Sequence, residues 1–114
     1  MVALQQERRR FMRFQTELEA DYWTGEAPAA GRARVLDVSR AGMRVTLAQP
    51  MLTGAPVEFT LQLPGDNVPI FASGDVAWAS AKPGQGGVGI RFRQIKSPDL
   101  ARMLDYAYAR WLGA

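Results

Sequence analysis

Residues 14–23, FQTELEADYW, alternate apolar and polar side chains without a break. Successive side chains of a strand point to opposite faces, so this period of two predicts a strand with one buried and one solvated face. The apolar face consists of Phe14, Thr16, Leu18, Ala20 and Tyr22, and the polar face of Gln15, Glu17, Glu19 and Asp21. We therefore interpret these carboxylates as a solvated face of an antiparallel strand, not as catalytic groups.

Five stretches downstream also have strand patterns, and residues typical of turns separate them. They are residues 32–38, 43–47, 57–63, 68–79 and 88–93. Residues 39–42 and 64–67 contain the serine, glycine, proline and asparagine that favour turns. Gly74 lies inside a predicted strand, where we expect a bulge or a close approach of another backbone.

The last segment, residues 97–114, has a helical pattern instead. It opens with Ser97-Pro98-Asp99, which offers an N-cap, a first-turn proline and an acid at the positive end of the helix dipole. Apolar side chains then recur at spacings of three and four, at Leu100, Met103, Leu104, Ala107, Tyr108 and Trp111. We expect this stripe to pack on the core rather than on a partner protein.

Six short strands and one helix favour a mainly β fold, a small barrel rather than a two-sheet sandwich. The 114 residues leave no room for a second core. We predict a flexible arginine-rich arm at residues 1–13, a barrel at residues 14–96, and a helix at residues 97–114 that packs on the barrel.

The composition excludes several kinds of chemistry. The chain has no cysteine and no histidine, which rules out disulfides, the usual zinc sites and every Ser-His or Cys-His device. No glycine-rich phosphate loop precedes a helix. No apolar run approaches a membrane span of about 20 residues, and residues 1–13 lack a signal-peptide pattern. We expect a cytoplasmic protein without membrane insertion, cofactor or enzymatic activity.

Arginines gather immediately before the first strand. The formal net charge is a modest +3, but Arg8, Arg9, Arg10 and Arg13 fall within six residues. A guanidinium is a planar fork of donors that matches phosphate or carboxylate oxygens. The cluster is either a solvated basic tail or a clamp for such groups.

A second segment, residues 37–42, reads DVSRAG and places a carboxylate and a hydroxyl at the mouth of a turn. Taken alone, Asp37, Ser39 and Gly42 are ordinary turn residues. Together with the arginines they provide donors for phosphates and acceptors for a base edge, a combination that favours a nucleotide ligand.

At these two segments the sequence resembles the PilZ domain family. The family motifs are Arg-x-x-x-Arg near the N-terminus, followed by Asp or Asn, any residue, Ser, two residues and Gly. The matching positions are Arg9 and Arg13 for the first motif, and Asp37, Ser39 and Gly42 for the second. The resemblance continues through Val76-Ala77-Trp78 and residues 87–92, and spans roughly residues 7–111.

The resemblance implies a six-stranded antiparallel β-barrel with a C-terminal α-helix. It also implies a ligand, the bacterial second messenger cyclic di-GMP. By carry-over, Arg9 and Arg13 would hold phosphates and the guanine Hoogsteen edge, while Arg8 and Arg10 would add phosphate or stacking contacts.

For the second motif, the resemblance implies that Asp37 and Ser39 accept hydrogen bonds from guanine N1 and N2. Gly42 would let the backbone turn close to the ligand, and Trp78 would lie against a guanine face. The chemistry agrees, because arginine forks match phosphates and the O6/N7 edge of guanine, and aspartate discriminates against adenine.

The expected function is that of a receptor whose arm becomes ordered on the ligand and signals to an unidentified partner protein. We hypothesise that the ligand binds as an intercalated dimer, because Arg8 and Arg10 add positive charge near four phosphates. One alternative is a PilZ-type adaptor that binds only proteins. The other is a small barrel that binds nucleic acid non-specifically, which Asp37 and the acidic face of residues 14–23 disfavour.

Overall fold

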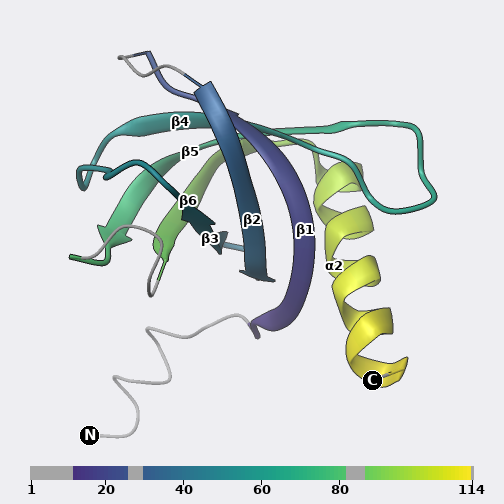
Figure 1. Ribbon diagram of the computed structural model, residues 1–114. Coiled ribbons are helices and arrows are strands. Elements are labelled where there is room, and N and C mark those ends of the chain that lie inside the picture. Colours follow the sequence, from purple (N-terminus) through teal and green to yellow (C-terminus); the bar gives the residue numbers. More distant parts are fainter. Residues whose placement is uncertain (1–11, 26–29, 82–86, 114) are drawn as a thin grey trace, which may run out of the picture.

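The computed structural model describes residues 12–25, 30–81 and 87–113. Within these residues, six antiparallel strands form a closed barrel in the order β1-β2-β3-β6-β5-β4 (Figure 1). Their bounds are Phe14–Trp23 (β1), Ala30–Val38 (β2), Gly42–Leu47 (β3), Pro56–Leu61 (β4), Ile70–Ala79 (β5) and Val88–Ile95 (β6). Pairing of β1 with both β2 and β4 closes the barrel, and the helix α2, Ser97–Gly113, follows. The predicted fold class is confirmed.

The alternation of β1 is the one the sequence predicts. Thr16, Leu18, Ala20 and Tyr22 are buried, and the residues between them are exposed. On the outer face, Arg32 of β2 makes ion pairs with Glu19 and Asp21 at 3.5 and 3.2 Å. These pairs are well solvated and contribute little to stability. The acidic residues of β1 therefore form a solvated face.

The core fills the barrel with side chains from all six strands. The largest fully buried side chains are Leu18, Met43, Leu61, Ile70, Met103, Val35, Val38, Val45 and Val76. Burying one such side chain contributes about 1.5–3 kcal/mol. Met103 shows that α2 contributes to the same core.

Helix α2 packs against β1 and β2. It begins at Ser97, and the Lys96 carbonyl accepts a 2.9 Å bond from the Leu100 amide. Lys96 therefore occupies the capping position predicted for Ser97, because the first helical bond forms one residue earlier. No helix in residues 12–25, 30–81 or 87–113 is long and apolar enough to cross a bilayer.

The prediction that the whole apolar stripe of α2 packs in the core is wrong for its C-terminal half. Met103 and Ala107 are fully buried, but Tyr108 is 45% and Trp111 57% exposed. The last turns lie beside the start of β1, where Phe14 meets both rings at centroid distances of 5.6 and 6.4 Å. The aromatic side chains thus form a half-exposed cluster instead of core.

Gly74 lies at both a bulge and a close approach, as predicted for this position. The register of β5 and β6 shifts between Ser73 and Gly74, and a Cβ on Gly74 would overlap the Arg91 carbonyl oxygen. Only a residue without a side chain lets the two backbones approach this closely.

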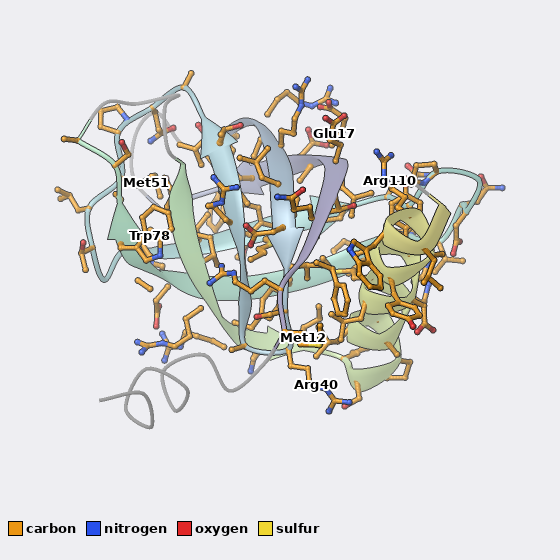
Figure 2. The ribbon with its side chains drawn as sticks, turned by 90° about the horizontal axis from the view of Figure 1, so that it is seen from below. Met12, Glu17, Arg40, Met51, Trp78 and Arg110 are labelled. Carbon is orange, nitrogen blue, oxygen red and sulfur yellow. The ribbon has the colours of Figure 1, made fainter. Side chains whose placement is uncertain are left out.

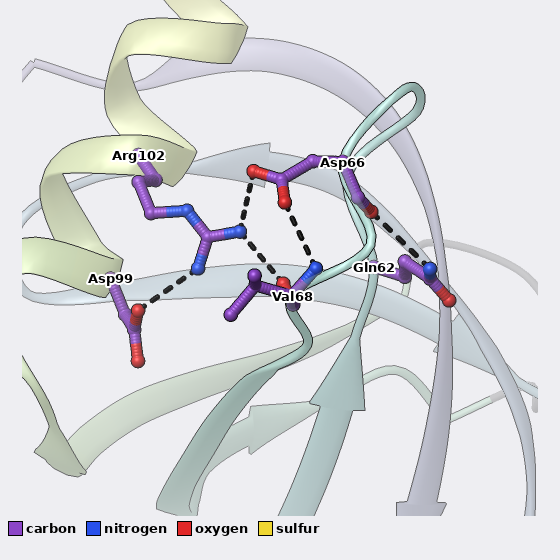
Figure 3. A network of polar contacts seen from close by, with 5 residues as sticks. All are labelled: Gln62, Asp66, Val68, Asp99 and Arg102. Atoms are coloured by element: carbon purple, nitrogen blue, oxygen red, sulfur yellow. Dashed lines mark hydrogen bonds and ion pairs between the residues drawn. The ribbon is translucent and has the colours of Figure 1, made fainter.

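A polar network joins the β4–β5 loop to α2 (Figure 3). Arg102 donates to Asp66 at 2.6 Å, to the Val68 carbonyl at 2.7 Å and to Asp99 at 3.0 Å. The Val68 amide donates to Asp66 at 2.9 Å. This amide, together with the Arg102 guanidinium, lowers the pKa of Asp66 below its usual value, and Asp66 in turn raises the pKa of Arg102.

Candidate functional site

A bulge in β2 brings Asp37 to the outside of the barrel. Strict alternation from the buried Val35 would direct Asp37 inward. However, Val35 pairs with Val45 while Asp37 pairs with Arg44, so β2 contains one more residue than β3 between these pairs. The extra residue turns Asp37 to the same face as Arg44 and returns Val38 to the core. Bulges often redirect side chains in this way.

A second bulge does the same for Trp78 in β5. Val76 pairs with Ile90 and points inward, and Trp78 pairs with Gly89. The indole lies directly over Gly89, because a Cβ on Gly89 would overlap the indole nitrogen. Trp78 is nevertheless 42% exposed, so one part of the ring packs on β6 and another part faces solvent.

The strand register aligns these residues in one row across the outer face. Asp37 of β2 pairs with Arg44 of β3, Arg44 with Gly89 of β6, and Gly89 with Trp78 of β5. We call these four residues the outer row. Figure 2 shows Trp78 on the side of the barrel away from α2. Neighbouring strands lie about 4.8 Å apart, so Arg44 is one strand spacing from Gly89, which the indole covers.

The Asp37 carboxylate lies between two guanidinium groups. Arg13 Nε and Nη2 each lie 3.1 Å from Oδ1, and Arg44 Nε lies 2.9 Å from Oδ2. The Asp37 side chain is only 11% exposed, against 32% for Arg44 and 46% for Arg13. Partial burial limits screening by solvent, so these charge-assisted bonds fix the carboxylate. The two sequence motifs therefore meet at one point.

Ser39 serves the turn between β2 and β3. Its hydroxyl accepts a bond from the Ala41 amide at 3.2 Å, and its own amide donates to the Gly42 carbonyl at 2.8 Å. Ser39 is buried and follows Asp37 of the outer row by two residues in sequence. The structure shows its role in the turn, and its contact with a ligand stays a prediction.

Gly42 has a packing reason to be glycine. A Cβ at this position would overlap the carbonyl oxygen of Ile90 on β6. The backbones of β3 and β6 can approach only when position 42 has no side chain. This requirement exists without any ligand, and the approach of a ligand to the Gly42 backbone stays a prediction.

Of the four predicted ligand-binding arginines, the structure describes Arg13. Arg8, Arg9 and Arg10 lie outside the described residues, whereas Arg13 precedes β1 and reaches Asp37. Sequence reasoning missed Arg44. Its position two residues after Gly42 marks it as an outward residue of a strand, but only the bulge in β2 places it opposite Asp37.

Two further arginines lie within three residues of outer-row residues in the sequence. Arg40 in the turn and Arg91, which pairs with Gly42, are both exposed. With Arg13 and Arg44 they make this end of the sheet favourable for an anion. Together with an exposed indole, it can hold a ligand that combines phosphates with flat aromatic bases.

A separate groove crosses the outer surface of β4, β5 and β6. Its volume is about 640 Å³, and its lining includes Glu58, Phe71, Arg93 and Lys96. None of the outer-row residues lines it. The groove is thus a surface distinct from the outer row, and an experiment that locates the ligand can distinguish between the two surfaces.

The chain thus combines a closed antiparallel barrel, a C-terminal helix and an arginine–carboxylate cluster on the outer wall of the barrel. The chain belongs to the PilZ domain family, whose model matches residues 7–109. The resemblance predicted from the two motifs is confirmed.

Among solved structures, the chain is similar to MotI/DgrA, the inhibitor of motility of Bacillus subtilis, with a TM-score of 0.74 and 20% sequence identity. The match covers 92% of this chain and 52% of that chain, so this chain spans about half the length of MotI/DgrA. At this identity the likeness concerns the fold alone. A search of curated proteins finds no match.

Proposed function

We propose that this protein is a cyclic di-GMP receptor that binds its ligand across the outer row and Arg13. PilZ domains are a family of cyclic di-GMP receptor and adaptor domains rather than enzymes. The observation that carries the proposal is the ion pair of Arg13 with Asp37 at 3.1 Å, beside Arg44 and the exposed Trp78. One residue of each family motif contributes to it.

The ligand chemistry fits these groups. Cyclic di-GMP has two phosphates for guanidinium forks and two guanines for stacking and edge contacts. A base stacked on an aromatic side chain contributes about 1–3 kcal/mol. Asp37 accepts from the N1 and N2 donors of guanine, and Trp78 supplies the stacking surface. Arg8, Arg9 and Arg10 add contacts from the arm.

The proposal includes a route from ligand to partner protein. A phosphate of the ligand would compete with Asp37 for Arg13. Arg13 is followed directly by Phe14, which packs on Tyr108 and Trp111 of α2. A change at Arg13 therefore reaches the half-exposed aromatic cluster at the end of the helix. A partner protein would read the ligand state at this cluster.

The second candidate function is that of an adaptor that binds only proteins. The exposed Tyr108, Trp111 and Leu112 on α2 favour it, since exposed apolar groups gathered on one surface mark interaction sites. Non-specific binding of nucleic acid is less favoured, because the outer face of β1 is acidic.

The test is a calorimetric titration of the purified protein with cyclic di-GMP, with GMP and single-stranded DNA as control ligands. Arg13→Ala should weaken cyclic di-GMP binding about ten- to hundredfold, the loss expected for one charge-assisted contact of about 1.5–3 kcal/mol. The matched control is Arg32→Ala, which removes an exposed guanidinium from the acidic face and should leave binding unchanged. The proposal would be contradicted if the wild-type protein did not bind cyclic di-GMP, or if it bound single-stranded DNA as tightly as cyclic di-GMP.

A further inference from the structure

We propose that Arg44 is a specificity-determining residue that, together with Asp37, reads the Watson–Crick edge of a guanine. The inference rests on the proposed function, because it adds a contact within the same site. Arg44 belongs to neither family motif, and its place in the site comes from the bulge in β2.

The ion pair leaves most of the Arg44 fork available. Arg44 donates to Asp37 through Nε at 2.9 Å. Asp37 is its hydrogen-bond partner among the described residues, and the contact uses neither Nη1 nor Nη2. A guanidinium presents five donors in a fixed plane. Arg44 can therefore hold the carboxylate with one edge and donate to a ligand with another.

Arg44 is also held more firmly than Arg13. It lies within β3, with paired neighbours on both sides, namely Asp37 and Gly89. Its stem packs on the start of β6, where a Cβ on Gly87 would lie 3.2 Å from Arg44 Cγ. Arg13 precedes β1 and is more exposed. When a phosphate draws Arg13 away, Arg44 keeps the carboxylate in place.

A carboxylate beside a guanidinium matches guanine and opposes adenine. Guanine presents the donors N1–H and N2–H next to the acceptor O6, so Asp37 accepts the first two and Arg44 donates to the third. Adenine presents a donor where guanine has O6 and an acceptor at N1. Both protein groups would then face the wrong partner, and a polar group left unpaired in a shielded site is costly.

Stacking on the Trp78 indole would fix the plane of the guanine that Arg44 and Asp37 contact. The outer row runs from Asp37 through Arg44 and Gly89 to Trp78, and the indole lies over Gly89. A guanine stacked on the indole, with its Watson–Crick edge directed along the row, meets Arg44 and then Asp37. The distance from Gly89 to Asp37 is about two strand spacings, roughly 10 Å, which suits a purine and its hydrogen bonds.

The test compares two ligands that share phosphates and sugars and differ in the base edge, cyclic di-GMP and cyclic di-AMP. Both are titrated calorimetrically into the wild type, Arg44→Leu, Arg44→Lys and Arg34→Leu. Arg34→Leu is the matched control, since Arg34 lies on the outer face of β2 in an exposed ion pair with Glu19 at 3.5 Å. It removes the same charge away from the outer row.

Arg44→Leu should lower the affinity for cyclic di-GMP about ten- to hundredfold. It should change the affinity for cyclic di-AMP about threefold or less, because the lost positive charge weakens binding while the lost mismatch with the adenine N6 donor favours it. The guanine preference then collapses in Arg44→Leu and persists in Arg34→Leu. Arg44→Lys keeps the charge and the stem but not the fork, and should keep only part of the preference.

An unchanged preference in Arg44→Leu, or an equal loss for both ligands, would overturn the inference while leaving the receptor function standing. Full preference in Arg44→Lys would also overturn it. A wild type that binds neither dinucleotide would overturn the proposed function and this inference together.

Discussion

Gly42 lies in β3 and faces β6, whereas Gly89 lies in β6 itself. The absence of a side chain matters at both positions, but for different reasons. At position 42 a Cβ would meet the backbone oxygen of Ile90, which cannot move without separating β3 from β6. At position 89 a Cβ would meet the Trp78 indole, which can rotate away. The first glycine protects the fold, and the second positions a side chain of the site.

Alanine substitutions should separate the two roles. We expect Gly42→Ala to cost about 1–3 kcal/mol, as overpacking does, and to lower Tm by several degrees. Gly89→Ala should lower Tm less but weaken cyclic di-GMP binding, because the indole loses its place in the outer row. Thermal unfolding and calorimetry of both variants check this, with Gly25→Ala, at an open position, as the control. Wild-type affinity in Gly89→Ala would show that Trp78 does not contact a base.

At the residue scale, the sequence identified Asp37 and Trp78 but could not explain their placement. Simple alternation assigns both side chains to the inside of the barrel, and only the bulges turn them outward. A bulge depends on pairing between strands, which a single strand's sequence does not reveal. Arg44 was missed for the same reason.

Among the elements, the β4–β5 loop and α2 are joined through Asp66 and Arg102 (Figure 3). The pKa of Asp66 is lowered from 3.8, first by the Val68 amide and then by Arg102. A carboxyl whose pKa is lowered by folding stabilises the fold fully above its unfolded pKa. It loses that contribution as the pH falls toward the lower folded pKa.

Asp66→Asn should therefore unfold at a lower temperature than the wild type at neutral pH, and the gap should narrow as the pH falls below about 4. Thermal unfolding between neutral and strongly acidic pH measures this gap, with Glu17→Gln on the outer face of β1 as the control. A gap that stays constant at every pH would mean that the Asp66 charge does not hold the loop.

For α2, periodicity predicted the helix and its buried face but not where burial stops. Met103 and Ala107 follow the prediction, whereas Tyr108 and Trp111 continue the same stripe into solvent. The spacing of apolar residues predicts which side of the helix is apolar. It does not predict how far the barrel extends along the helix, because the extent of the barrel depends on the packing of β1.

For the whole molecule, the number of bound ligands depends on positive charge around the outer row and the arm. Two intercalated cyclic di-GMP molecules bring four phosphates together, and their repulsion requires nearby cations. Arg13 supplies one of these cations, and we expect Arg8, Arg9 and Arg10 to supply the others. These three arginines lie outside the described residues.

Calorimetry should accordingly give about two ligands per chain for the wild type, and Arg8→Leu should bring the value toward one. Arg34→Leu serves as the control for the loss of one positive charge. One ligand per wild-type chain at saturation would contradict the dimer and leave the receptor function intact.

The barrel as a whole was predictable, since six alternating strands with short turns leave few other ways to bury one face of each strand. The pairing of strands that closes the barrel was harder to predict from the sequence. The pairing of β1 with β4 joins stretches far apart in sequence, and no local signal in residues 14–23 or 57–63 indicates that contact.

The central claim is that cyclic di-GMP binds on the outer row, and nuclear magnetic resonance of the ¹⁵N-labelled protein tests it most directly. During a titration, the largest shifts should occur at the amides of residues 37–44 and 87–90 and at the Trp78 indole N–H. Shifts gathered instead around Phe71, Arg93 and Lys96, in the groove over β4, β5 and β6, would contradict the claim.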